Sequence, residues 1–363
     1  MTCNSDETNH LDFPETIEGD EASPWYWEYM LGTTFTEEKI YLLAGDYFID
    51  MIRFAWVIYV NVEKYNETWE SSFGGIEYLY QDVLDGKFDY DWLMMFMADS
   101  WEDDGDGEPE PDEDELISFL GASVMPRVFV WSNGISIATE DKTAIRENVS
   151  DLYACAMKYK ELFNTEGVYE FVTHTANTNG VLDATTLFLN KNVLFTMSVL
   201  GEMESEQVRN TDGLTKGVLP YPKYDLTQQT EYHTLVHDQA EIAAILNTTQ
   251  KFTEATAWLQ LINEKSTAVL YEYYEKSLKL KYNDAPLNKQ MIDLVHETID
   301  SPFESLVISY VTGNSTVATN IYTIFQSDAT KMSDSFNSSY AGAYPSYKTY
   351  YEEVRDIYMN LAD

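Results

Sequence analysis

The sequence predicts a globular α/β protein. Short apolar runs of strand length alternate along the chain with segments in which apolar residues recur at helical spacing. This interleaving is typical of folds whose helices pack on the faces of a sheet. With 363 residues, of which 44% are hydrophobic, the chain is long enough for two domains and a sizeable core. Its longest apolar stretches, such as 54–60, are far shorter than the ~20 residues that a membrane helix requires.

The N-terminal part predicts a loose tail followed by strands and short helices. Residues 1–23 are acidic and nearly lack periodic apolar positions, so order is expected to begin at the aromatic cluster Pro24–Trp27. Asp89 is expected to cap a helix, because its side chain can accept a hydrogen bond from the first helical turn. The strands of this part are predicted at 40–44 and 54–60, and the helices at 76–84 and from Asp91 onward.

The middle of the chain continues the alternation after an acidic segment at 99–115. Apolar runs on either side of Ser132-Asn133-Gly134 predict two strands joined by a turn, at 128–131 and 135–138. A helix is predicted to begin near Ser150, because apolar residues follow at spacings of four, three and four. These residues are Leu152, Ala156, Tyr159 and Phe163. A helix ending at Leu189 and strands at 193–199 and 217–219 come next.

The C-terminal third is predicted to be mainly helical. Thr249 is expected to cap a helix on which Trp258 packs into the core beside Leu259 and Leu261. Further helices are predicted at 266–282 and 288–299, with a closing amphipathic helix that carries Val354, Ile357, Tyr358 and Leu361.

Charge and cysteine content exclude several classes of partner and site. Lys and Arg number 22 against 62 Asp and Glu, a net charge of −40, so nucleic acid and anionic membrane surfaces would be repelled. This charge favours colloidal solubility outside a cytoplasm. The two cysteines, Cys3 and Cys155, offer no disulfide framework or CxxC metal site. The stretch Met1–Glu7 is polar and acidic, unlike a secretory signal peptide.

An ordered set of segments resembles a known family. The run Gly217–Asp225, with its Pro-Tyr-Pro core, is the most specific of them. The others, in chain order, are Lys39–Tyr41 with Gly45-Asp46, Val57–Asn61, Leu79–Val83, Gly86–Phe88, Gly105–Gly107, Asn192–Phe195, Tyr271–Glu275 and Leu278–Tyr282. Together they resemble the family 1 extracellular solute-binding proteins, especially the long lipoproteins of Gram-positive gut bacteria.

The resemblance implies a two-lobe, periplasmic-binding-protein-like fold of type II. Crossing hinge strands would join the lobes, and a ligand held between them would be delivered to the transmembrane subunits of an ABC permease. Residues 1–52 and 221–300 would form lobe one, and 53–220 with 301–363 lobe two. Family members begin with a lipoprotein signal and the first strands of lobe one, which this sequence does not show. An N-terminal truncation of lobe one is therefore expected, through a truncated gene model, a gene fragment or a partner chain that completes the lobe.

Candidate ligand-binding residues follow from the resemblance and from the aromatic content. Polar side chains are expected where the hinge strands cross, at Asp46, Asp50, Arg53, Tyr221, Asp238 and Gln239. Trp131 is added because sugars stack on aromatic rings. For Trp131 a core position is the alternative, and each polar residue has the alternative of a hinge or surface role without ligand.

The acidic segment reads in the register of a calcium-binding EF-hand loop. Gly107 takes the tight-turn position, and the cation would be Ca²⁺. The predicted oxygen ligands are Glu102, Asp104, Asp106, the carbonyl of Glu108, Glu110 and Glu113. A solvated acidic loop without a metal is the alternative.

These observations predict a non-catalytic receptor. His233 and His237 lack the Glu of an HExxH zinc motif, and the GxSxG, GxGxxG and P-loop motifs are missing from the sequence. We expect a monomeric extracellular carbohydrate-binding protein of an ABC importer, anchored as a cell-surface lipoprotein in the full-length family. The alternatives are a carbohydrate-active enzyme, a surface lectin, or a fragment that binds nothing.

Overall fold

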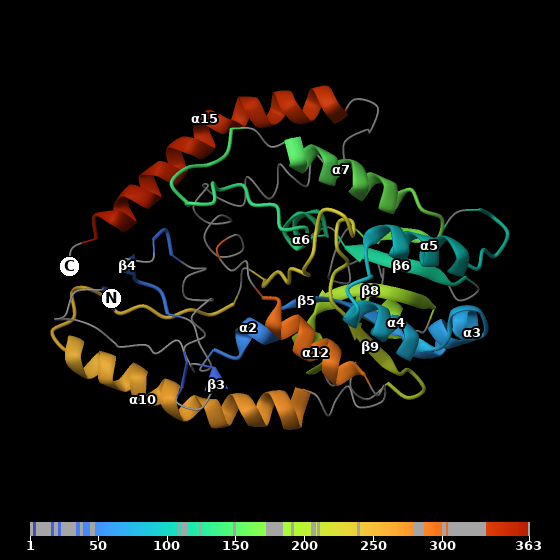
Figure 1. Ribbon diagram of the computed structural model, residues 1–363, viewed down its shortest axis with the longest axis horizontal. Helices are drawn as coiled ribbons and strands as arrows, with labels where there is room; N and C mark the ends of the chain where they lie inside the picture. Colours follow the sequence, from blue (N-terminus) through green and yellow to red (C-terminus); the bar gives the residue numbers. More distant parts are fainter. Residues whose placement is uncertain are drawn as a thin grey trace.

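The structure is a computed structural model, and its parts are shown in Figure 1. It describes residues 3–4, 16–17, 21–22, 34–36, 39–43, 48–107, 109, 115–122, 125–147, 150–171, 184–189, 192–204, 208, 211–237, 240–278, 287–299, 303 and 332–361. Helices and strands alternate through these ranges, as the sequence predicts.

A five-stranded mixed sheet forms the centre of the larger part of the molecule. Its strand order is β7-β6-β8-β5-β9. The strands are β5 (Trp56–Asn61), β6 (Ile117–Ala122), β7 (Val168–Phe171), β8 (Val193–Val199) and β9 (Lys216–Leu219). β6 runs parallel to β7 and β8, whereas β5 is antiparallel to β8 and β9. All six residues of β5 are buried, as expected for a central strand covered on both faces.

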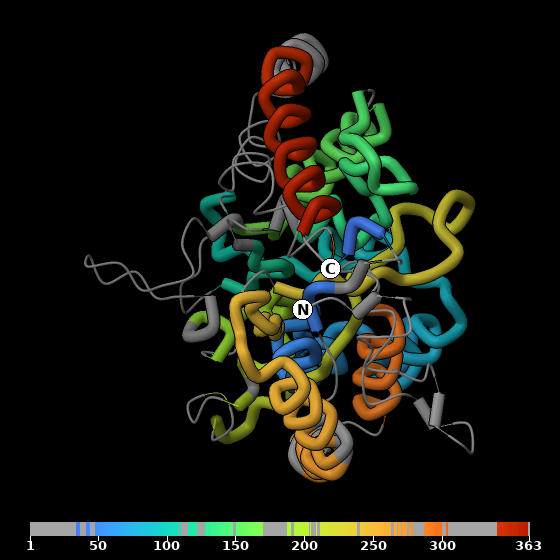
Figure 2. The backbone as a smooth tube through the Cα atoms, turned by 90° about the vertical axis from the view of Figure 1, so that its left-hand side faces the viewer, coloured from blue at the N-terminus to red at the C-terminus, as the bar shows by residue number. Residues whose placement is uncertain are grey.

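Helices cover the sheet and extend beyond it. In chain order they are α2 (Asp50–Arg53), α3 (Val62–Phe73), α4 (Ile76–Leu84), α5 (Tyr90–Ser100), α6 (Met125–Ser132), α7 (Ser150–Phe163), α8 (Ala184–Leu189), α10 (Phe252–Tyr271), α12 (Asn288–Glu297) and α15 (Met332–Met359). A 3₁₀ segment, η1 (Leu200–Glu204), follows β8, and a π-helical segment, η2 (Glu272–Leu278), follows α10. α10 and α15 lie on opposite sides of the molecule, away from the sheet (Figures 1 and 2).

Short strand pairs precede the sheet in the sequence. β1 (Cys3–Asn4) pairs antiparallel with β4 (Lys39–Ile40), and β2 (Thr16–Ile17) pairs antiparallel with β3 (Glu21–Ala22). The predicted strand at 40–44 is therefore only partly confirmed, because regular pairing covers Lys39–Ile40 and then an isolated bridge joins Leu43 to Ala243.

Side chains alternate between two cores along β5. Ile58 and Val60 belong to the cluster that includes α3, α4, α5 and α7, while Val57 and Tyr59 belong to the cluster that includes α8 and part of α12. This two-residue period is the one expected of a strand. The sheet therefore separates two hydrophobic layers.

Two helix starts illustrate how local sequence sets the boundaries. The Asp89 carboxylate accepts a 2.9 Å hydrogen bond from the Trp92 amide, which confirms the predicted cap of α5. The predicted cap of α10 is wrong: the helix begins after Lys251 without a side-chain cap, and Thr249 instead accepts a hydrogen bond from the Lys251 amide at 3.2 Å.

Two further predictions are corrected by the packing. The run Val128–Trp131 lies in α6 and not on a strand, because a short apolar run that is buried on every side has no period that distinguishes strand from helix. Trp258 was expected in the core, but 63% of it is exposed on α10.

A buried polar network fastens α12 to the sheet. Asn288 accepts from the Tyr80 hydroxyl and from the Val218 amide, the latter at 3.2 Å, and its own amide group donates to the Lys216 carbonyl at 2.9 Å. Beside it, a Cβ at Gly217 would lie 2.3 Å from both the Tyr80 Oη and Val60 Cγ1, so this strand position requires glycine.

α15 packs back onto the sheet-bearing part of the molecule. The hydroxyl of Tyr340 donates to the Arg146 carbonyl and that of Tyr351 to the Lys142 carbonyl, both at 2.7 Å. These bonds bring the C-terminal helix against the loop that precedes α7. None of the helices in the described ranges is long and apolar enough to cross a membrane.

Candidate functional site

One edge of the sheet is the natural place for a ligand. Because β6, β7 and β8 are parallel, their carboxyl ends lie at the same edge, and the antiparallel β5 begins there, with Trp56 opposite Val199. In open α/β sheets, ligands bind in the crevice outside the carboxyl ends of the strands.

Three segments that are distant in the sequence meet at this edge. The Trp56 amide donates to the Leu235 carbonyl at 2.9 Å, and the His237 amide donates to the Phe54 carbonyl at 2.8 Å. Isolated bridges join Ala55 to Val236 and Thr234 to Ile299. The segment 234–237 therefore lies beside the residues that lead into β5 and beside the end of the segment that contains α12.

A cluster of polar side chains lies next to these segments. Arg53 donates through Nη1 to Asp50 Oδ1 at 3.0 Å and through Nε to Glu204 Oε2 at 3.1 Å, and its Nη2 lies 3.0 Å from the same Glu204 oxygen. The Tyr273 hydroxyl donates to the other oxygen, Oε1, of Glu204. We call Asp50, Arg53, Glu204 and Tyr273 the Arg53 cluster.

The four members of the cluster come from three separate elements. Asp50 and Arg53 lie one turn apart on α2, which ends just before β5 (Figure 1). Glu204 ends η1 after β8, and Tyr273 lies in η2. π-helical turns are rare and are frequent at functional sites.

The ionisation states in the cluster follow from its contacts. Burial lowers the pKa of Arg53, but Glu204, Tyr273 and Asp50 raise it, and the net result is a pKa above the ordinary value. Burial, followed by the hydrogen bond to Glu204, raises the pKa of Tyr273, so its hydroxyl stays neutral and donates. Counted as one Arg, one Asp and one Glu, the cluster has a formal charge of −1.

The cluster is sheltered but still reaches solvent. The side chain of Arg53 is 35% exposed, that of Glu204 21% and that of Asp50 16%. Carboxylate oxygens at such a site accept hydrogen bonds from hydroxyl groups, and partial shelter strengthens these bonds compared with bulk water.

Aromatic rings adjoin the cluster. Trp56 stacks on His237 with ring centroids 5.5 Å apart, and His237 lies 5.9 Å from Phe54. The Arg53 guanidinium lies 6.0 Å from the centre of the Phe54 ring. The start of β5, the segment around His237 and the Arg53 cluster are therefore packed together.

The structure brings together only part of the predicted ligand set. Asp50 and Arg53 are ion-paired at the sheet edge. Trp131 is only 2% exposed and lies on α6 within the core, in agreement with the alternative weighed for it. Tyr221 is also buried in the core, and this burial raises the pKa of its hydroxyl. The other predicted residues, Asp46, Asp238 and Gln239, lie outside the described residues.

Sequence reasoning missed Glu204 and Tyr273. Glu204 lies shortly after the strand predicted at 193–199, so the rule about carboxyl ends of strands could have identified it. Tyr273 is part of the Tyr271–Glu275 segment that carries the family resemblance, but nothing in the local sequence links it to Glu204.

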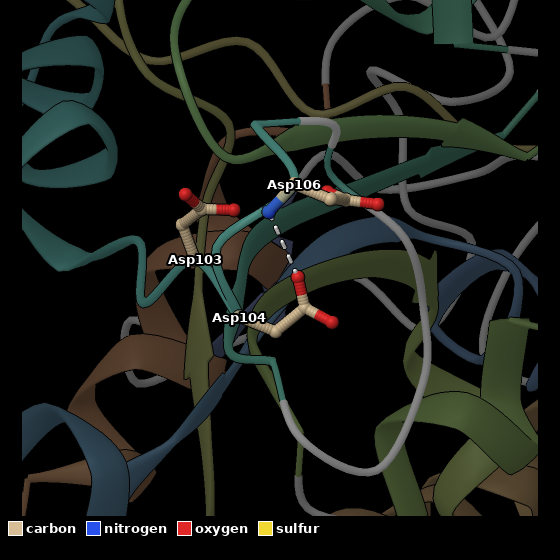
Figure 3. A group of neighbouring side chains, drawn as sticks. All are labelled: Asp103, Asp104 and Asp106. Atoms are coloured by element: carbon tan, nitrogen blue, oxygen red, sulfur yellow. Dashed lines mark hydrogen bonds between the residues drawn. The ribbon is translucent and has the colours of Figure 1, made fainter.

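The acidic loop lies elsewhere, between α5 and β6. Asp103, Asp104 and Asp106 are exposed, and a carboxylate oxygen from each lies within 4.8 Å of the others (Figure 3). The Asp106 amide donates to Asp104 Oδ1 at 3.2 Å, and the Gly107 amide donates to Asp103 Oδ1 at 3.0 Å.

Two of these three residues, Asp104 and Asp106, are also predicted calcium ligands. Glu102 begins the loop and forms a bridge to Leu116, while the predicted ligands Glu108, Glu110 and Glu113 lie outside the described residues. Asp103 joins the group although the register omits it. Three carboxylates at this spacing suit a hard cation, but exposed acidic groups often gather without one. Calcium binding therefore stays a prediction.

Comparisons with known proteins bear on the fold. No protein-family model and no curated protein sequence matches the chain. Among solved structures, the maltose/maltodextrin-binding domain MalE from Bdellovibrio bacteriovorus, bound to maltotriose, has a TM-score of 0.51 at 13% identity, covering 91% of this chain and 77% of that one. The sugar-binding protein MalE from Xanthomonas citri has a TM-score of 0.55 at 8% identity, covering 93% and 77%.

Identities this low establish a shared fold and nothing more. The predicted α/β fold class is confirmed, since the chain shares its fold with both structures. The chain therefore has the α/β fold of these two sugar-binding proteins.

Proposed function

We propose that this chain is a carbohydrate-binding component of an ABC importer and that its ligand contacts the Arg53 cluster. The observation that carries the proposal is the position of this cluster. It is a partly exposed group of hydrogen-bonding side chains at the carboxyl edge of the sheet, in a fold shared with sugar-binding proteins. Sugar hydroxyls would donate to the carboxylate oxygens of Asp50 and Glu204.

The contacts at the hinge support a mechanism of lobe closure. We propose lobe one at 1–52 and 221–300, and lobe two at 53–220 and 301–363. In that division the bond from Tyr273 to Glu204 joins the two lobes, and α12 spans them through its contacts with β9 and α4. A ligand that bridges the same groups would favour the closed arrangement by its differential affinity for it.

The cellular location of the protein and its permease partner are part of the same proposal. We propose that the protein acts outside the cytoplasm as a non-catalytic, monomeric receptor, held at the cell surface as a lipoprotein, and passes its ligand to permease subunits. The net charge of −40 supports a surface that stays dispersed and avoids polyanionic partners.

Calorimetric titration with a panel of di- to tetrasaccharides tests the proposal. We expect saturable binding of at least one sugar, weakened tenfold or more by Arg53→Ala. Lys87→Ala is the matched control, because Lys87 also pairs with two carboxylates, Asp82 at 3.1 Å and Asp85 at 2.8 Å, on an exposed surface. Circular dichroism of each variant establishes that it is folded.

Two results would overturn the proposal. An equal loss of sugar affinity in Arg53→Ala and Lys87→Ala would show that binding does not depend on the Arg53 cluster. Conversion of the sugar to defined products during the titration, seen by chromatography, would favour the carbohydrate-active enzyme instead.

A further inference from the structure

The positive charge in the Arg53 cluster is already compensated. Arg53 contacts Glu204 through two nitrogen atoms and Asp50 through a third, at 3.0–3.1 Å. Among the described residues, the ion pairs of Asp50 and Glu204 are both with Arg53. Lys276, the cation nearest in sequence to Tyr273, is paired with Glu272 instead. One guanidinium therefore serves two carboxylates.

An acidic ligand would meet an unfavourable field here. Its carboxylate would have to displace Asp50 or Glu204 from Arg53. Otherwise it would lie beside two carboxylates whose negative charge exceeds the single positive charge of Arg53. Like charges in a partly sheltered site disfavour one another, and the net charge of −40 would also slow the approach of an anion. A hydroxyl group has neither problem, because it donates to a carboxylate without displacing the guanidinium.

From this arrangement we infer that the Arg53 cluster selects non-acidic sugars and rejects their uronate counterparts. This inference rests on the proposed function, since it assigns the substrate class of the same site. Asp50 and Glu204 are then specificity-determining residues, which exclude a carboxylate by charge while they accept hydroxyls. The neutral Tyr273 hydroxyl holds Glu204 Oε1 and so helps to orient that carboxylate.

The experiment compares neutral oligosaccharides with the same sugars oxidised to a carboxylate at C6. Calorimetry at low salt is expected to give at least tenfold weaker binding of the uronate by the unchanged protein. Glu204→Gln keeps the shape of the side chain but removes one of the two negative charges that compensate Arg53, and is expected to raise uronate affinity tenfold or more. Asp50→Asn is a second variant with the same expected direction, should Glu204→Gln fail to fold.

A matched control uses the exposed pair between Asp82, on α4, and Lys87, which follows that helix. Asp82→Asn removes one carboxylate from Lys87 in the same way and should leave the uronate affinity unchanged, which excludes a general effect of net charge. Equal or tighter uronate binding by the unchanged protein, with neutral sugars also bound, would overturn this inference while the proposed function stands. If neither class of sugar binds, the proposed function fails and the inference falls with it.

Discussion

The helices α7 and α10 carry apolar residues at similar spacing but differ in what covers them. On α7 the residues Leu152, Ala156 and Tyr159 are buried against the sheet. On α10 the residues Phe252, Ala255 and Leu259 are only partly buried against the other hydrophobic cluster, and Trp258, Leu261 and Val269 are exposed. Helical periodicity thus predicts that a helix forms, but burial depends on a partner surface that only the tertiary structure supplies.

A pair of tryptophans makes the strongest test of this difference. Trp131→Ala should lower the free energy of unfolding by about 3–5 kcal/mol, because it removes a fully buried aromatic side chain from the core and leaves a cavity. Trp258→Ala should change it by less than about 0.5 kcal/mol, because most of that side chain is already in water. Urea denaturation followed by circular dichroism measures both. Equal losses would mean that α10 is covered in solution.

A smaller effect is expected where a helix is fixed by polar contacts. Asn288→Ala on α12 should cost about 1–3 kcal/mol, because it removes the buried acceptor of the Tyr80 hydroxyl and the buried donor to the Lys216 carbonyl. Asn360→Ala is the control: within the described part of the chain, this exposed side chain bonds the Asp356 carbonyl alone, and the expected change is below about 0.5 kcal/mol. The same denaturation experiment applies. A cost for Asn288 no larger than for Asn360 would show that the network does not fix α12.

The smallest effect concerns the exposed loop that follows α5. If Ca²⁺ binds, a concentration of ten times the dissociation constant should stabilise the protein by about 1.4 kcal/mol, measured as a rise in melting temperature. Asp104→Ala and Glu113→Ala should abolish the rise. Asp103→Ala discriminates between the two arrangements, because the EF-hand register omits Asp103 whereas the structure groups it with Asp104 and Asp106. No shift at millimolar Ca²⁺ would dismiss the site.

The sequence predicts those parts of the fold that local chemistry determines. The strand at 54–60 corresponds to β5 because its apolar run includes β-branched residues and is short, and the start of α5 follows from the side chain of Asp89. The error at Val128–Trp131 has the opposite cause, since complete burial removes the period on which the assignment depends. The exposure of Trp258 was missed for a similar reason, as neighbouring leucines do not reveal what lies across from a helix.

Sequence reasoning predicts two of the four residues of the Arg53 cluster. Asp50 and Arg53 are close along the chain, and the family resemblance predicts that they lie where hinge strands cross. Their partner Glu204 follows a strand that pairs with β5, so the contact depends on sheet topology. Tyr273 donates to Glu204 from a π-helical turn, and no pattern in the sequence predicts this turn or the contact.

The position of β5 in the sheet has a consequence for how the protein is made. β5 is the earliest strand of the sheet to leave the ribosome, yet both of its neighbours, β8 and β9, are synthesised much later. Until then its apolar run has no strand beside it, and contacts between distant parts of a chain form slowly. Until β8 and β9 have emerged, β5 is an unpaired apolar strand, the kind of segment that is prone to aggregate during synthesis.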